Sequence, residues 1–173
     1  MKKILVTISI LVLSAAAFAA PKITRADKDK AAELVGKMTL DEKISLISGK
    51  VDGFHTAEIA RLGIPSIRMA DGPQGVRNKT KSTFYPSGIA TAATWNREAA
   101  RGVGAGIATD ARARGVGIML GPGVNIYRIA LCGRNFEYYG EDPYLTGEIA
   151  CSYIEGMQDK GVMATIKHFA FNT

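Results

Sequence analysis

The sequence is poor in cysteine and tryptophan, with two cysteines and one tryptophan in 173 residues. Two cysteines, Cys132 and Cys151, are too few for a disulfide framework. Neither has a second metal-ligating residue at a useful spacing, so the cysteines do not indicate a metal site. Buried free thiols are the preferred interpretation, and a bridge between the two cysteines stays open as the alternative.

The chain also lacks low-complexity tracts, linkers and concentrated runs of one charge, so it is read as one domain or part of one. Lysine and arginine number 22 against 16 aspartates and glutamates, and the excess is scattered, with no interleaved aromatic stripe. A nucleic-acid-binding protein needs a basic face or groove, so no nucleic-acid partner is expected. The 47% hydrophobic content fits a globular protein with one sizeable core.

One segment near the N-terminus is apolar almost throughout. Residues 4–18 follow a short basic start, and small residues lie at the positions that a signal peptidase reads. The run is too short for a membrane span, so residues 1–19 are predicted to be a bacterial Sec-type signal peptide cleaved after Ala19. Cleavage would remove two lysines and lower the net charge from +6 to +4. Residues 20–173 are expected in the periplasm or secreted, without stable membrane insertion.

Hydrophobic periodicity and capping signals divide the mature chain into alternating elements. Helices are predicted over residues 28–36, 40–48, 97–114 and 145–160. Strands are predicted over residues 64–70, 116–120 and 162–166. A capping box from Thr39 to Glu42 opens the second helix, and Asn96 caps the third. Apolar strands separated by helices indicate a parallel α/β sheet.

Two α/β folds compete for this pattern, a doubly wound sheet and a (β/α)8 barrel. Polar residues follow each predicted strand, which is how a barrel builds a site, whereas a doubly wound sheet usually binds through a glycine-rich phosphate turn. The glycine-rich run 102–106 lies inside a predicted helix, so a dinucleotide fingerprint is rejected and close helix packing is inferred instead. The predicted fold is a partial (β/α)8 TIM-type barrel, roughly its first half, because a full barrel takes about 250 residues.

The residues at the predicted strand ends are all strong hydrogen-bond donors or acceptors. Asp71 is an acceptor, Arg77 and Arg134 are forked donors, Lys167 is a point donor, and His168 can donate or accept. A monosaccharide presents a ring of hydroxyls, and holding it in one orientation takes carboxylate and cationic groups from several directions. These five residues are the candidate binding site for a small carbohydrate.

Several ordered motifs resemble glycoside hydrolase family 3, and the resemblance covers nearly all of residues 20–173. The motifs are Asp71-Gly72-Pro73-Gln74-Gly75-Val76-Arg77, Gly133-Arg134-Asn135-Phe136-Glu137, Glu141-Asp142-Pro143 and Lys167-His168-Phe169-Ala170-Phe171-Asn172. The opening segments Met38-Thr39-Leu40-Asp41-Glu42-Lys43 and Arg61-Leu62-Gly63-Ile64-Pro65 also resemble the start of that family. Within the family, the pattern is similar to β-glucosidases and their β-xylosidase relatives.

The resemblance implies a (β/α)8-type barrel followed by a second α/β domain, and a retaining hydrolysis of terminal β-linked sugars without a cofactor. It implies that Asp71 accepts from glycone hydroxyls and that Arg77 supports Asp71. Arg134, Lys167 and His168 would donate to the remaining hydroxyls of the same sugar.

The resemblance assigns no catalytic residue to this chain. The family's nucleophile is an Asp beside Trp on a late barrel strand, and Trp95 precedes the second predicted strand. We therefore expect both catalytic carboxylates to lie beyond Thr173, and a chain of this length to be inactive by itself.

Other interpretations remain beside these. Arg134 could form a structural ion pair with Glu137 or Glu141, two carboxylates better suited to bracing a loop than to catalysis. His55 is read as a surface or packing histidine, and Trp95 as a hydrophobic staple at a helix start. A non-catalytic sugar-binding remnant and an unrelated α/β protein remain the alternative functions, and the oligomeric state stays open.

Overall fold

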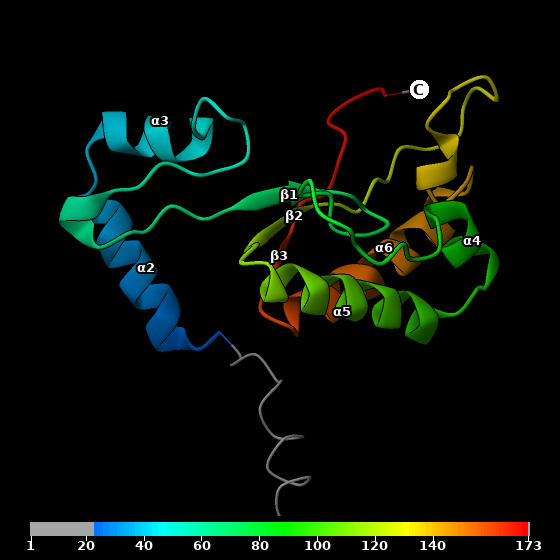
Figure 1. The fold of residues 1–173 in the computed structure, drawn as a ribbon, viewed down its shortest axis with the longest axis horizontal. Helices are drawn as coiled ribbons and strands as arrows, with labels where there is room; N and C mark the ends of the chain where they lie inside the picture. The colour runs from blue at the N-terminus through cyan, green and yellow to red at the C-terminus, as the bar shows by residue number, and fades with distance from the viewer. Residues whose placement is uncertain (1–22, 173) are drawn as a thin grey trace, which may run out of the picture.

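A small parallel sheet forms the centre of the molecule in the computed structural model, which describes residues 23–172. Its strands are β1 (Met69–Asp71), β2 (Ile118–Leu120) and β3 (Met163–Ala164), in the order β1-β2-β3. Two helices, α5 (Arg97–Ala113) and α6 (Pro143–Gln158), connect successive strands and lie together on one side of the sheet (Figure 1). The predicted α/β class, with helices between neighbouring parallel strands, is confirmed. The predicted signal peptide lies outside the described residues.

The strands are shorter than predicted. Residues 64–68 make only isolated bridges, because Pro65 has no N–H to donate and regular pairing begins after it. Beyond β3, a parallel bridge between Gly123 and Lys167 continues the sheet. This bridge carries Lys167 to the same edge at which β1 ends.

The α5–α6 contact depends on two glycines. A Cβ on Gly104 would lie 2.0 Å from the carbonyl oxygen of Tyr153, and a Cβ on Gly156 would lie 2.0 Å from that of Arg101. Gly102, by contrast, faces open space. The inference that small residues in this helix serve close packing is therefore confirmed for Gly104, which lies in the glycine-rich run.

The main core lies between the sheet and the α5–α6 layer. Met119 of β2 is fully buried there with Ile107 of α5 and Met157 of α6. Tyr153, also in α6, is buried and donates from its hydroxyl to the carbonyl of Pro73 at 3.2 Å. This bond ties α6 to the loop that follows β1.

A second, smaller core involves a helix that the sequence did not predict, α4 (Gly88–Ala93). Gly88 lies against the backbone of Glu137, where a Cβ would approach the carbonyl oxygen to 2.4 Å. Glu137 ends the short 3-10 helix η2 (Asn135–Glu137).

Another 3-10 helix, η1 (Ala60–Leu62), precedes β1.

Two helices, α2 (Arg25–Lys37) and α3 (Leu40–Ser48), stand away from the sheet (Figure 1) and contain no buried residue. Each begins with a capping box, Thr24 with Asp27 in α2 and the predicted Thr39 with Glu42 in α3. The first box starts α2 three residues before the predicted start. None of the helices within residues 23–172 is long and apolar enough to cross a membrane.

Two expectations about single residues are wrong. Trp95 is 74% exposed and has a positive φ of 52°, so it does not act as a hydrophobic staple at the start of α5. Both cysteines are free, as preferred, but neither is buried, since Cys151 is exposed on α6 and Cys132 is half-buried in a loop.

Candidate functional site

Asp71 and Lys167 meet at the carboxyl edge of the sheet, although Asp71 ends one outer strand, β1, and Lys167 follows the other, β3. The Nζ of Lys167 donates to Oδ1 of Asp71 at 2.6 Å, and the lysine side chain is only 14% exposed. Burial raises the pKa of the Asp71 carboxyl, but the hydrogen bond and charge of Lys167 outweigh it and lower the pKa overall. Asp71 is therefore an ionised acceptor at neutral pH.

Arg77 lies beside Asp71, in the loop that follows β1. An N–H of its guanidinium lies 3.5 Å from Oδ2 of Asp71, and its backbone N–H donates to the Asp71 carbonyl at 2.9 Å. The loop can turn back this tightly because Gly72 has a φ of +117° and a Cβ there would lie 1.8 Å from the carbonyl oxygen of Gly75.

Arg134 forms a two-point ion pair with Glu137 rather than with Glu141. Its Nε donates to Oε1 at 2.5 Å and a terminal nitrogen donates to Oε2 at 3.0 Å. Glu137 is 5% exposed, and its hydrogen bonds raise the pKa of Arg134. The structural pairing left open by the sequence is present. The pair uses two of the five guanidinium N–H donors, so Arg134 can still serve a ligand.

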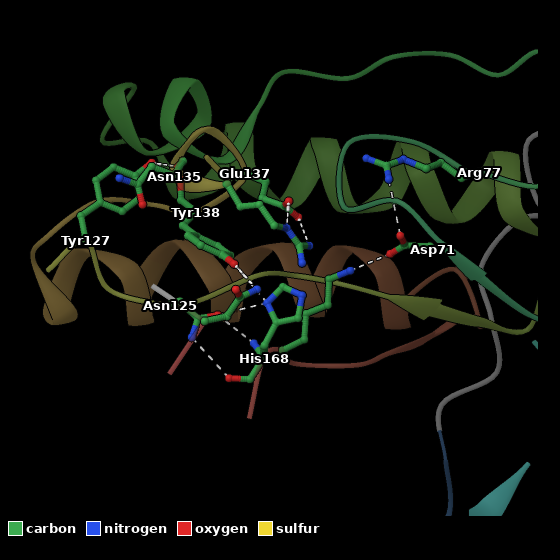
Figure 2. A network of polar contacts seen from close by, with 11 residues as sticks. Asp71, Arg77, Asn125, Tyr127, Asn135, Glu137, Tyr138 and His168 are labelled. Carbon is green, nitrogen blue, oxygen red and sulfur yellow. Dashed lines mark hydrogen bonds and ion pairs between the residues drawn. The ribbon is translucent and has the colours of Figure 1, made fainter. Parts of the chain in front are cut away.

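His168 lies against Tyr138 and Asn125 (Figure 2). Its Nδ1 is 3.1 Å from Oδ1 of Asn125 and 3.2 Å from the Tyr138 hydroxyl, which also accepts a 2.9 Å hydrogen bond from Asn172. Burial and then the positive charges of Arg134 and Lys167 lower the pKa of His168. The imidazole is therefore neutral at neutral pH.

The five predicted residues form one cluster. The charges of Arg134, Lys167, Glu137 and Asp71 all act on His168, and hydrogen bonds link Asp71 to Lys167 and Arg77. Figure 2 shows Asp71, Arg77 and His168 within one network of polar contacts. The other histidine, His55, is half-buried and bonds instead to Asp52 at 2.6 Å, which fits its reading as a surface or packing histidine.

Sequence reasoning missed Asn125 and Tyr138. Asn125 lies in the polar loop after β2, the same kind of place that pointed to Asp71 and Lys167, so its position was a usable signal. Tyr138 is 1% exposed and reads as a core residue, since nothing local shows that its hydroxyl meets His168. Among residues 23–172, no group of three His, Cys, Asp or Glu side chains is arranged to hold a metal ion.

The site thus combines an ionised carboxylate, three cations and a neutral imidazole at one edge of a parallel sheet. The profile of the glycosyl hydrolase family 3 N terminal domain matches residues 26–172. The chain belongs to this family. Its mixed α/β fold is that of the family's TIM-barrel-like N-terminal domain.

Curated relatives of the chain are β-glucosidases. Thermostable beta-glucosidase B of Acetivibrio thermocellus is 47% identical over 152 residues, which cover 81% of this chain and 20% of the relative. A beta-glucosidase of Rhizobium radiobacter is 45% identical over 146 residues, covering 81% of this chain and 18% of the relative. The chain thus spans about a fifth of the length of these relatives.

Solved structures agree with the sequence comparison. Beta-glucosidase 3B from Thermotoga neapolitana in complex with glucose is 40% identical, with a TM-score of 0.74, and the match covers 83% of this chain and 24% of that one. Beta-glucosidase from Kluyveromyces marxianus in complex with glucose is also 40% identical, with a TM-score of 0.75 and coverage of 82% and 18%.

Proposed function

We propose that this chain supplies the sugar-binding half of the active site of an exported retaining β-glycosidase, of β-glucosidase type, that hydrolyses terminal β-linked sugars in carbohydrate catabolism. The observation that carries the proposal is the convergence of Asp71, Lys167, His168 and Arg134 at the carboxyl edge of one parallel sheet. The glucose bound in solved relatives of 40% identity supports a small carbohydrate ligand.

The chemistry of the cluster suits one sugar ring. Asp71 is ionised and accepts hydrogen bonds from hydroxyl donors, while Lys167 and Arg134 donate to hydroxyl oxygens. A site that pairs each hydroxyl rejects analogues that lack one, because its own buried polar groups would then be left without partners. This chemistry needs no metal and no organic cofactor.

The same cluster is unsuited to hydrolysis by itself. A retaining glycosidase uses two carboxyl groups about 5 Å apart, and one of them is an acid with a raised pKa. Within residues 23–172, Asp71 has a lowered pKa and Glu137 is buried in its pair with Arg134. We therefore propose that residues 20–173 bind the sugar and do not cleave it.

Calorimetric titration with glucose, alongside an assay with an aryl β-glucoside, tests both parts. Purified residues 20–173 are expected to bind glucose weakly and to show no turnover. Asp71→Asn should weaken binding by about tenfold or more, since a hydrogen bond to a charged group is lost. Asp29→Asn, a matched change in the exposed helix α2, should leave binding unchanged.

Two results would contradict the proposal. Turnover that survives removal of contaminating hydrolases would show that the catalytic carboxylates are present after all. Equal glucose affinity in the wild type and Asp71→Asn would remove the cluster from sugar binding. Xylose in the same titration separates a glucose-type from a xylose-type site.

Export is a separate part of the proposal and rests on the apolar run 4–18 after its basic start. Expression of the full chain in a bacterium, followed by mass spectrometry of the periplasmic fraction, is expected to show a protein that begins at Ala20. A chain that keeps its first residues and stays in the cytoplasm would overturn export.

A further inference from the structure

The side-chain amide of Asn125 is held at both ends by the backbone of His168. The backbone N–H of His168 donates to Oδ1 of Asn125 at 2.9 Å, and Nδ2 of Asn125 donates to the His168 carbonyl at 3.3 Å. A backbone N–H can only donate and a carbonyl can only accept, so the two bonds fix which end of the amide is oxygen.

This orientation constrains the imidazole. The Nδ1 of His168 lies 3.1 Å from the same Oδ1, and an amide oxygen can only accept. If Nδ1 carried no proton, its lone pair would face a lone pair of the amide oxygen at this distance, and the two would repel each other. Nδ1 must therefore carry the proton. The Tyr138 hydroxyl, 3.2 Å from Nδ1, can act as a second acceptor for it, because a hydroxyl oxygen has two lone pairs.

The other ring nitrogen is left for a ligand. Within residues 23–172, the hydrogen bonds of the imidazole ring are made through Nδ1. Figure 2 shows the second nitrogen on the side of the ring away from Asn125. A neutral ring with its proton on Nδ1 has a lone pair on Nε2.

We propose that Asn125 is a positioning residue that holds His168 in the neutral Nδ1–H tautomer, so that Nε2 accepts a hydrogen bond from a sugar hydroxyl. The proposal rests on the proposed function and changes the role that the family resemblance implied for His168 from donor to acceptor. It also adds a hydrogen-bond acceptor to a site in which Lys167 and Arg134 can only donate. A hydroxyl that donates to His168 can then accept from one of these cations.

The two histidines make a direct test practical. A long-range proton–nitrogen correlation spectrum of histidine-labelled protein shows which ring nitrogen is unprotonated, since Nε2 couples to both ring carbon protons and Nδ1 mainly to one. At neutral pH and without sugar, His168 is expected to show an unprotonated Nε2. An unprotonated Nδ1 in the wild type, or a doubly protonated ring, would overturn the inference.

Variants separate the two neighbours of Nδ1. Asn125→Ala should move the proton to Nε2, the form favoured by free imidazole side chains, whereas Tyr138→Phe should leave it on Nδ1. A switch in Tyr138→Phe with no change in Asn125→Ala would assign the control to Tyr138 and overturn the role of Asn125. Asn96→Ala, which removes an amide cap from α5 at a comparable cost in stability, should leave the His168 spectrum unchanged.

Addition of glucose distinguishes this inference from the proposed function. Glucose is expected to shift the Nε2 signal of the wild type, and Asn125→Ala should bind it about tenfold more weakly. A confirmed Nδ1–H tautomer with no response to glucose would refute the sugar-binding function and leave the positioning role of Asn125 intact.

Discussion

Lys167 donates a 2.6 Å hydrogen bond to Asp71 across 96 positions of sequence, joining the ends of the first and third strands above the second. The pair places a cation and an anion side by side at the sheet edge, where the lysine lowers the pKa of the Asp71 carboxyl and keeps it ionised. It also makes the candidate site sensitive to acid.

The free energy of unfolding should depend on pH through Asp71. The lowered pKa means that the unfolded chain takes up a proton near its ordinary value of 3.8 while the folded chain does not. The stability contributed by the pair is therefore present above about pH 4 and is lost as the pH falls through the folded pKa. Denaturation curves at several pH values should show a smaller acid-induced loss in Asp71→Asn than in the wild type.

Lys167→Met provides the complementary measurement. Burial of Asp71 is then no longer opposed by the lysine, so its pKa rises and the acid-induced loss weakens. At neutral pH this variant should lose about 1.5–3 kcal/mol of unfolding free energy, the range for hydrogen bonds to charged groups. Identical pH profiles in the wild type and both variants would show that the pair does not govern the acid response.

The glycines of α5 and α6 should differ sharply when replaced by alanine. Gly104→Ala and Gly156→Ala place a methyl group 2.0 Å from a backbone oxygen of the other helix, which forces the helices apart at a cost of about 1–3 kcal/mol. Gly102→Ala meets nothing within 4 Å and should stabilise α5 by about 0.5–1 kcal/mol. Chemical denaturation measures all three. A similar effect at the three positions would contradict the helix contact described above.

Arg134→Lys keeps the charge but loses the fork that holds both oxygens of Glu137. Because Glu137 is 5% exposed, the variant should lose about 1–2 kcal/mol of unfolding free energy. Arg97→Lys is the matched control, since Arg97 pairs with Glu148 at an exposed position and should change stability by less than about 0.5 kcal/mol. Equal losses in the two variants would argue against a special role for the buried pair.

The two thiols should both be free and should react at different rates. Cys151 is exposed and Cys132 is half-buried, so a thiol reagent should label Cys151 first. Peptide mapping of the labelled native protein assigns the order, and Cys151→Ser should remove the fast phase. A bridged peptide containing both cysteines under non-reducing conditions would contradict the structure.

The helices could be predicted where their ends carry local signals. Thr39 with Glu42 and the Asn96 cap are short-range devices, and α3 and α5 begin where these residues indicate. Helix α4 has no side-chain cap bond and depends on contact with the backbone of Glu137, far along the sequence. No local pattern records such a contact, and α4 was therefore missed.

The residues of the candidate site likewise fall into those that the local sequence indicates and those that it does not. Asp71 and Lys167 could be found because charged residues at the ends of apolar strands are conspicuous, and parallel strands bring those ends together. Asn125 and Tyr138 act through their distance to His168, which depends on how two loops fold over the sheet edge. The strands were predicted to be too long because a run of apolar residues indicates burial but does not show which of those residues hydrogen-bond to a neighbouring strand.

The helical arm of α2 and α3 has a consequence for how the chain comes apart. Neither helix of the arm contains a buried residue, although Met38 between them is 7% exposed, and Arg61 binds the arm through Glu42 and the Lys37 carbonyl. Its amide hydrogens should therefore exchange with solvent through small local openings, while those of β2, α5 and α6 should exchange only when the core opens. A protease such as trypsin should accordingly cut within the arm long before it reaches the sheet.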